Sequence, residues 1–363
     1  MRLLSVPSKS TQMWIERCRV NQWLFLGVSI HNLDDGLKGI PLNDTAPPHD
    51  AEVWEGHVMI DIEDKEPKPF HYTDHIPQEY AHLPAETWPS SFEKQGDILM
   101  VKFEQEQYKD IIANAMLDHF GNIRLVCADD GVQGDFRVRE LAIVASRDGS
   151  TSTQTSVKEH GVSIQTNPGV AYYSSRLSHE REVTCSHIEA LVTKLQRKVV
   201  VADLYAGVGP SFGLLFQRDL VAGFIANDLN PKAVELLEIN IDEFTKKLND
   251  VQPALITCED ARSLVRREEV QGIVDVLLVN LPHDSLEHLP FLFRCLQTDQ
   301  TTLLRGWTII ERTEFSFLES SLRTICHDAN AEVEHIEIND VKGYSMAKVF
   351  ASYTLEVCVR SNR

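Results

Sequence analysis

The chain has 363 residues and a mass of 41.1 kDa, enough for two or three domains with separate hydrophobic cores. Its 35 basic and 54 acidic residues give a net charge of −19, so on charge alone a nucleic acid is a poor partner. No apolar run approaches the roughly 20 residues that a membrane-spanning helix needs, and we expect no membrane partner. The seven cysteines have no paired spacing, which argues against disulfides or a zinc site and for a reducing compartment.

Residues 1–85 are predicted to be a divergent N-terminal segment or domain that is rich in loops. Much of the acidic charge lies here, in the runs 34–35, 50–55 and 61–66. The first 20 residues are faintly similar to a transit peptide, although an ordinary N-terminal segment is the favoured interpretation. Prolines interrupt any long element of this segment, at Pro41, Pro47, Pro48, Pro67 and Pro69.

Residues 86–187 have the pattern of a compact α+β module. The run 97–103 is strand-like, and 104–118 carries apolar residues at helical spacing. A second strand is predicted over 123–128, and 154–165 is predicted to be a hairpin that turns at His160-Gly161.

From residue 188 onward the pattern becomes strand, helix, strand, which is typical of a doubly wound, largely parallel sheet. A helix is predicted to begin at Asn230-Pro231, with Asn230 as N-cap and proline in the first turn. Two final β-rich runs, 332–338 and 347–353, predict an antiparallel edge strand. The parallel strands are predicted at 199–203, 223–227, 254–258, 274–279 and 306–311.

The loop after the first of these strands predicts a nucleotide-type cofactor. Gly207 and Gly209 let the backbone turn tightly and approach a ligand. A dinucleotide such as NAD prefers a third glycine three residues on, whereas Gly213 follows after four. Asp203 would repel a phosphate but suits the amino group of a methionine moiety beside a sulfonium. The pattern therefore favours S-adenosylmethionine over NAD.

Two further acids and one amide follow later strands, at the edge where such sheets bind ligands. Asp228 is expected to bond ribose hydroxyls, and Asp260 to meet the adenine amino group, to cap the helix that starts at Ala261, or both. Asn280-Leu281-Pro282 either ends a strand with a cap or turns the Asn280 amide toward a planar base. One proline and no aromatic residue in this motif favour a ring nitrogen as target over an exocyclic amine.

Together these residues resemble the archaeal and eukaryotic tRNA (guanine-N1)-methyltransferases that modify position 37, over roughly residues 90–363. The wybutosine-type aminocarboxypropyl transferases are similar but usually lack the motifs at 227–231 and 280–282. The resemblance implies a Rossmann-like class I methyltransferase fold, preceded by an α+β RNA-binding domain. Five segments carry it: Phe136–Glu140, Tyr172–Arg181, Ala206–Pro210, Ala226–Pro231 and Asn280–Pro282.

The resemblance also implies roles at the site. Glu180 would be the general base for the guanine N1 proton, and Arg137 would hold O6. Tyr172 and Asn280 would help to position the flipped base, with Arg176 and Pro282 as further substrate contacts. The residues expected at the cofactor are Arg181, Asp203, Gly207, Gly209, Asp228, Leu229, Asp260, Ala261 and Asn280.

Three departures from the family pattern accompany the resemblance. Ser211 intervenes between Gly-Val-Gly-Pro and Phe212, Ser285 stands where alanine is common, and the basic C-terminal signature is blurred at 340–344. A non-catalytic relative that binds RNA or protein, or an aminocarboxypropyl transferase acting on tRNA, are therefore the alternatives. We expect an intracellular monomer of the cytoplasm, nucleus or mitochondrial matrix that acts on tRNA with guanine at position 37.

Overall fold

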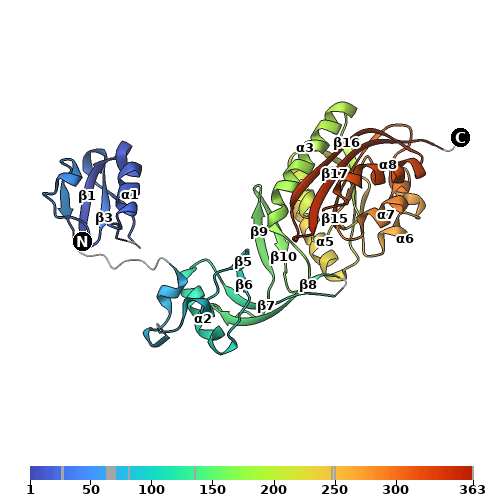
Figure 1. Ribbon diagram of the computed structural model, residues 1–363. Coiled ribbons are helices and arrows are strands. Elements are labelled where there is room, and N and C mark those ends of the chain that lie inside the picture. Colours follow the sequence, from blue (N-terminus) through green and yellow to red (C-terminus); the bar gives the residue numbers. More distant parts are fainter. Residues whose placement is uncertain are drawn as a thin grey trace. The chain divides into compact units, whose positions relative to one another are not determined.

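The computed structural model describes residues 1–25, 28–62, 71–80, 82–134, 136–246, 248 and 251–361. Figure 1 shows the chain coloured from the N-terminus to the C-terminus. The chain forms two compact units, of which one contains Met1–Ser90 with Glu104–Asn122 and the other Ser91–Phe103 with Ile123–Arg363. Among the described helices, none is both long and apolar enough to cross a membrane.

The first 62 residues form a small sheet and a helix where the sequence predicted mainly loops. The strands lie in the order β2-β3-β1-β4, and Trp14 and Trp54 are buried in the core beside them. Pro41 lies inside β3, so the proline that suggested a break is part of a strand. Pro67 and Pro69 and the end of the acidic run 61–66 lie outside the described residues. The elements are β1 (Arg2–Pro7), α1 (Thr11–Val20), β2 (His31–Asn32), β3 (Leu37–Leu42) and β4 (Met59–Asp61).

The same unit contains α2 (Lys109–His119), the helix that the apolar spacing predicted. Its buried face carries Ile112 and Met116, which are one helical turn apart. The helix begins later than predicted, because a short 3-10 turn over Glu106–Tyr108 precedes it.

The second unit begins with a four-stranded sheet in the order β5-β6-β7-β8. β6 and β7 run parallel and the other pairs antiparallel. The apolar face of β6 and β7 buries Ile98, Met100, Leu125 and Cys127. The strands are β5 (Phe92–Gln95), β6 (Ile98–Val101), β7 (Leu125–Gln133) and β8 (Val138–Ser146).

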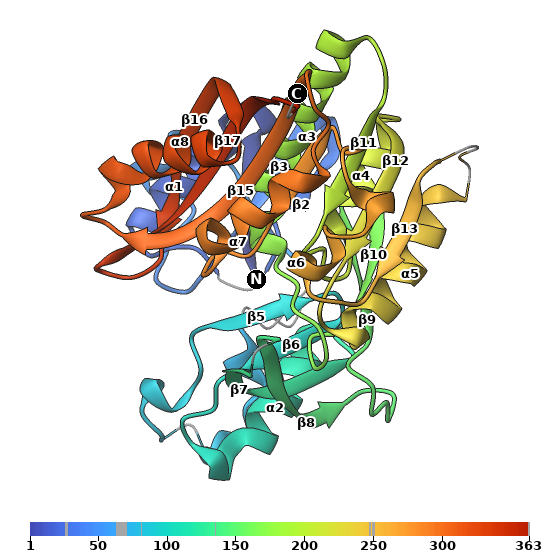
Figure 2. The same cartoon turned by 90° about the vertical axis from the view of Figure 1, so that its right-hand side faces the viewer.

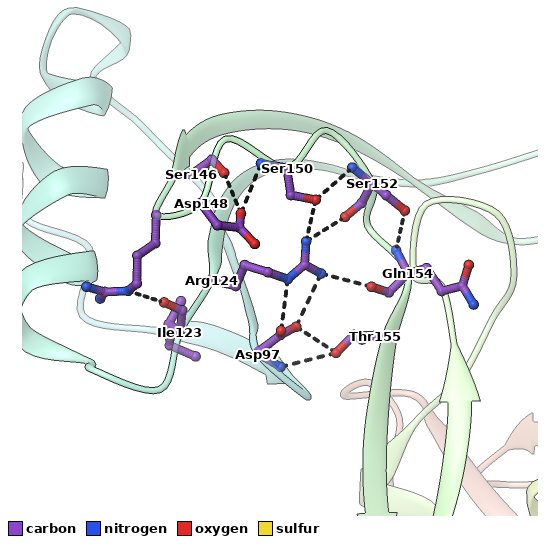
Figure 3. Close-up of polar contacts among 10 residues, drawn as sticks. Asp97, Ile123, Arg124, Ser146, Asp148, Ser150, Ser152, Gln154 and Thr155 are labelled. Atoms are coloured by element: carbon purple, nitrogen blue, oxygen red, sulfur yellow. Dashed lines mark hydrogen bonds and ion pairs between the residues drawn. The ribbon is translucent and has the colours of Figure 1, made fainter.

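Arg124 joins this sheet by hydrogen bonds to residues 150–154 of the loop that follows β8 (Figure 3). Its Nε donates to Asp97 Oδ2 at 2.9 Å, and its terminal nitrogens donate to Ser150 Oγ and to the carbonyls of Ser152 and Gln154. Since all these acceptors belong to β5–β6 or to the stretch 150–154, one guanidinium fixes the course of the chain into the next hairpin.

That hairpin consists of β9 (Thr155–Glu159) and β10 (Val162–Thr166) and confirms the prediction over 154–165. Its turn uses His160 and Gly161, both with positive φ. The buried Asn240 accepts from the Gln165 amide and donates to the carbonyls of Gln165 and Val208, at 2.7–2.8 Å. A single side chain therefore joins the hairpin to the glycine loop.

A seven-stranded sheet forms the rest of the unit, in the order β13-β12-β11-β14-β15-β17-β16. The first five strands are parallel, and β17 runs antiparallel to both β15 and β16. This confirms the predicted doubly wound sheet with an antiparallel edge. The strands are β11 (Val199–Asp203), β12 (Val221–Asn227), β13 (Ala254–Thr257), β14 (Val276–Val279), β15 (Thr301–Glu311), β16 (Ala331–Gly343) and β17 (Lys348–Val359).

Helices cover both faces of this sheet. α3, α4 and α5 pack with one buried cluster of the strands, and α6, α7 and α8 pack with another. Figure 1 shows α3 and α8 on different sides of β15 and β17, and Figure 2 shows α6 and α7 in a second view. The helices are α3 (Ser178–Leu195), α4 (Pro210–Gln217), α5 (Pro231–Thr245), α6 (Ala261–Leu264), α7 (Ser285–Leu292) and α8 (Leu318–Asp328).

Candidate functional site

A cavity of about 440 Å³ lies where the parallel strands end, inside the second unit. Its lining comes from the β7–β8 hairpin, the stretch before α3, the ends of β11, β12, β13 and β14, and the β16–β17 hairpin. Ten of the predicted site residues line it: Arg137, Tyr172, Arg181, Gly207, Asp228, Leu229, Asp260, Ala261, Asn280 and Pro282.

The glycine loop turns as its sequence predicts. Gly207 and Gly209 have φ values of +56° and +76°, a region that glycine enters without strain. Gly209 is the N-cap of α4 and Pro210 starts that helix. A Cβ on Gly209 would collide with Leu237 of α5, so the loop also packs closely beneath the cavity.

Asp228 holds this loop in place. Its Oδ2 accepts from the Gly207 amide at 2.7 Å, and its Oδ1 accepts from the Asn230 amide at 2.9 Å. Burial raises the pKa of Asp228, and the backbone N–H groups of Asn230 and Gly207 counteract part of that rise. Asn230 is the N-cap of α5 and accepts from the Lys232 amide, as predicted. The Asp228 carboxylate is thus fixed on the cavity wall with room for a further donor.

Asn227 is a cavity residue that the sequence reasoning did not identify. Its amide nitrogen donates to the carbonyls of Leu204 and Glu259, and its oxygen accepts from Thr257 and from the Glu259 amide. These four bonds tie together the ends of β11, β12 and β13. Its position directly before Asp228 at a strand end was the available signal.

Asp203 is buried behind the loop and does not line the cavity, unlike the sequence expectation. Only 2% of the residue is exposed, and its Oδ1 accepts from the Tyr205 amide at 3.3 Å. Burial raises its pKa to about 7, and the nearby Asp228 carboxylate contributes to the rise. Gly209 is likewise absent from the lining, because its role is the turn into α4.

Asp260 serves α6 as its N-cap and also faces a neighbouring arginine. It accepts from the Arg262 amide at 2.8 Å and pairs with the Arg262 guanidinium at 2.7 Å. The hydrogen bond from the Arg262 side chain lowers the pKa of Asp260. Nearby, the Tyr205 hydroxyl lies 2.8 Å from His288 Nδ1. We call Asp228, Glu259 and Asp260 the acidic wall of the cavity.

A second group of lining residues is largely exposed and carries rings and cations. Arg137 lies at the tip of the β7–β8 hairpin with φ +53°, and its side chain forms no ion pair with described residues. The His283 and Tyr344 rings meet edge to face at 6.1 Å. Burial and the Arg137 guanidinium lower the pKa of His283. We call this group the rim: Phe136, Arg137, Tyr172, His283, Lys342 and Tyr344.

Asn280 and Pro282 connect the rim to the sheet. Pro282 accepts a hydrogen bond through its carbonyl from the Ile309 amide of β15 at 2.7 Å. The Asn280 side chain forms no hydrogen bond with the part of the chain that the structure describes, so its amide is available to a ligand.

Arg181 lines the cavity from the first turns of α3. It forms two 2.6 Å hydrogen bonds with the Glu159 carboxylate and donates to the Ser174 carbonyl. Glu159 also accepts from the Tyr173 hydroxyl at 2.8 Å. Only 7–8% of either charged side chain is exposed, so this pair is a buried link between β9 and α3.

Glu180 and Arg176 do not line the cavity. The Glu180 carboxylate is held by Arg305 and Trp307 of β15, both at 2.9 Å. Arg176 is mostly exposed and lies 3.3 Å from Glu93 of β5. The structure therefore brings Arg176 to the smaller sheet, and it leaves Glu180 beside the cavity, between residues that do line it.

Comparison with known proteins agrees with this arrangement. Residues 155–334 match the TRM5/TYW2 methyltransferase domain, and residues 74–149 match the TYW2 N-terminal domain. A tRNA (guanine(37)-N(1))-methyltransferase from Vitis vinifera is 31% identical over 264 residues, 68% of this chain and 40% of that protein. One from Methanocaldococcus jannaschii is 35% identical over 151 residues, 42% of this chain and 38% of that protein.

Solved structures share the fold. Trm5b from Pyrococcus abyssi aligns with a TM-score of 0.63 at 22% identity and covers 99% of both chains. A structure described as the complex of aTrm5 and tRNALeu aligns with a TM-score of 0.64 at 21% identity, over 98% of this chain and 99% of that one. The chain spans about two fifths of the length of the first curated relatives that it matches. The matched model and the relatives together establish that the chain contains a TRM5/TYW2 methyltransferase domain.

Proposed function

We propose that this protein transfers a methyl group from S-adenosylmethionine to N1 of guanine 37 in tRNA. The observation that carries the proposal is the convergence of separate motifs on one cavity. Arg137 and Tyr172 come from segments before the large sheet, whereas Asp228, Asn280 and Pro282 follow its strands. Curated relatives with this activity support the same assignment.

The acidic wall fits the adenosine part of S-adenosylmethionine. Asp228 is a fixed acceptor suited to ribose hydroxyls, and Leu229 and Ala261 add apolar surface for a purine ring. Arg181 and Asn280 are the polar groups next to this wall that we assign to the methionine part. When bound, S-adenosylmethionine supplies an electrophilic methyl group. Asp203, being buried behind the loop, is assigned to the support of that loop instead.

The rim fits an unstacked nucleobase in an RNA chain. Single-stranded RNA is usually recognised by aromatic rings that stack on bases and by cations that meet its phosphates and carbonyls. Tyr172, His283 and Tyr344 supply rings, and Arg137 and Lys342 supply cations. A base must leave its stack to enter such a site, which costs a few kcal/mol.

Guanine N1 is a weak acid, so its proton must leave as the new N–C bond forms. We assign proton removal to Glu180, which stands beside the cavity on α3. The Arg137 guanidinium is assigned to O6, where negative charge gathers as N1 loses its proton. Besides its contact with the methionine part, the Asn280 amide is assigned to hold the base in plane, because it has both a donor and an acceptor to offer.

The test uses an unmodified tRNA transcript with guanine at position 37 and S-adenosylmethionine labelled in its methyl group. We expect 1-methylguanosine after digestion to nucleosides, and no labelled nucleoside from a matched transcript with adenine at position 37. If the protein binds S-adenosylmethionine but forms no 1-methylguanosine, the proposal is overturned. Glu180→Gln should lower the transfer rate about 10²- to 10⁴-fold and leave cofactor affinity unchanged. Equal losses in rate and affinity would contradict the role of Glu180 as base.

Aminocarboxypropyl transfer to tRNA is the second candidate. The matched domain is named after both TRM5 and TYW2, and residues 74–149 match the TYW2 N-terminal domain. The two reactions take different carbons from the same cofactor. A parallel reaction with S-adenosylmethionine labelled in its carboxyl group separates them. Label in the tRNA from the carboxyl group, but not from the methyl group, would establish the second candidate.

A further inference from the structure

The carboxylate of Glu180 is held by two donors on a single oxygen. Arg305 Nη2 and Trp307 Nε1 both reach Glu180 Oε2 at 2.9 Å. The other oxygen, Oε1, accepts no hydrogen bond from the residues that the structure describes. Two donors on one oxygen fix the plane of the carboxylate and leave the second oxygen available.

The donors are themselves fixed. Arg305 is 1% exposed, its Nε donates to Thr184 Oγ1 at 2.8 Å, and its Nη1 donates to Thr354 Oγ1. The Arg305 guanidinium also lies over the Trp307 ring, 5.3 Å from its centre. Each of its three nitrogens thus has an assigned partner, on α3 or on β17. The Glu337 carboxylate of β16 acts with Glu180 to favour the charged form of Arg305, and the Arg305 guanidinium in turn lowers the pKa of His187 on α3.

This cluster lies directly beside the cavity. Leu177, directly before α3, and Arg181, the residue after Glu180 in α3, both line the cavity. On β15, Ile309 lines it too, and Arg305, Trp307 and Ile309 share one face because alternate residues of a strand point the same way. Glu180 therefore has cavity-lining neighbours both along its own segment and on β15, the strand that holds its carboxylate.

We propose that Arg305 and Trp307 are positioning residues that hold the Glu180 carboxylate by Oε2 and present Oε1 to the substrate base. The inference rests on the proposed function, in which Glu180 takes the N1 proton. In that step the N1–H bond breaks and an Oε1–H bond forms, while Arg305 keeps its charge and both bonds to Oε2 persist. A buried arginine–carboxylate pair contributes little net stability compared with apolar residues of similar size, so stability alone does not account for it.

Residues that act only through Glu180 have a distinctive kinetic signature. Once Glu180 is replaced, the catalytic carboxylate is already absent. A second change at Trp307 or Arg305 should then have little further effect on the rate. The losses in rate should then be strongly non-additive, whereas two independent structural defects multiply. This difference separates a positioning role from a general contribution to folding.

The experiment measures the single-turnover rate of methyl transfer with saturating S-adenosylmethionine and tRNA. Trp307→Phe keeps an aromatic ring, although a smaller one than the indole, and removes the N–H, so we expect the rate to fall about tenfold, with KM for tRNA and cofactor affinity unchanged. Arg305→Lys keeps the charge but loses the planar fork, and should lower the rate further. In the Glu180→Gln background, both changes should alter the rate less than twofold.

Multiplicative losses in the Glu180→Gln background would overturn the proposal, as would an unchanged rate in Trp307→Phe. Arg197→Met is the matched control, because Arg197 pairs with the buried Asp275 at 2.6 Å and does not line the cavity. It should lower the melting temperature without changing the rate. Absence of 1-methylguanosine with the unchanged protein would instead refute the proposed function, so the two failures are distinguishable.

Discussion

The acidic wall and the rim belong to one cavity but differ in the charge, burial and hydrogen bonding of their side chains. Carboxylates of the wall are held by backbone amides or by a neighbouring arginine. The rim carries exposed rings, and Arg137 and Lys342 form no ion pair with described residues. The chain has a net charge of −19, yet two cations, Arg137 and Lys342, line this cavity. The net charge of the whole chain is therefore a poor guide to what this cavity binds, because it does not reveal the local positive charge of the rim.

Replacing the rim cation should have the largest effect on chemistry. Arg137→Met removes the charge assigned to guanine O6, and we expect the transfer rate to fall about 10²- to 10³-fold. Cofactor affinity, which depends on the wall, should stay unchanged in an equilibrium binding measurement. Arg323→Met on α8 is the control, because Arg323 pairs with Glu319 on the surface and does not line the cavity. A loss of cofactor affinity in Arg137→Met would contradict the assignment of the cofactor to the wall and of the base to the rim.

Replacing the fixed carboxylate of the wall should have the reverse pattern. Asp228→Ala removes a charged acceptor, and a hydrogen bond to such a group contributes about 1.5–3 kcal/mol, or roughly 10- to 100-fold in cofactor affinity. Affinity for tRNA should change little. Calorimetry with S-adenosylmethionine and filter binding with tRNA check the two expectations. Equal losses for both ligands would mean that Asp228 supports the whole cavity.

The buried carboxyl group behind the wall should make stability depend on pH. The pKa of Asp203 is about 7 in the folded protein, whereas an unfolded aspartate has a pKa of about 3.9. The folded state therefore holds the extra proton between these values, and its stability falls as pH rises through this window, by up to about 1.4 kcal/mol per unit.

Asp203→Asn should remove this dependence. Without cofactor, the variant should match the unchanged protein near pH 4 and exceed its stability increasingly up to about pH 7, with no further gain above. Urea unfolding across this range measures the difference, with exposed Asp242→Asn as control. Parallel stability curves for Asp203→Asn and the unchanged protein would show that Asp203 is not protonated in the folded state.

The smallest expected effect concerns salt. Lys342→Ala should reduce the dependence of tRNA affinity on salt by about 0.7 in the log–log slope, the contribution of one contact to a single-stranded phosphate. Binding measured between about 50 and 200 mM salt gives the slope. An unchanged slope would remove Lys342 from the RNA-binding part of the rim.

Local sequence patterns predicted the large sheet well, because the apolar runs of its strands are followed by glycine, aspartate or asparagine residues that mark where the strands end. Asn230 before proline and the glycine pair 207 and 209 adopt the predicted roles at the starts of α5 and α4. The partners of Glu180 could not be predicted, since Arg305 and Trp307 lie 125 and 127 residues away along the chain. Asp203 follows the usual strand-end position, yet its side chain is covered by the loop that follows it.

The N-terminal sheet escaped prediction for a different physical reason. Its strands are short, and β3 includes both Gly39 and Pro41, residues that disfavour strands on average. Here the buried rings of Trp14 and Trp54 and their neighbours stabilise what local propensity does not. The roles of the site residues stay predictions that the experiments above test, and the compartment stays a prediction as well.

The amide of Asn240 limits how the chain can be divided. A chain cut at residue 187 would lose the β9–β10 hairpin and leave this fully buried amide without its two bonds to Gln165. It would also leave Arg181 outside the remaining piece, together with its partner Glu159. Any shortened form meant to keep the glycine loop in its native shape must therefore begin before Thr155. A chimaera that joins the large sheet to a different RNA-binding domain would likewise have to include the chain from before Thr155 onward.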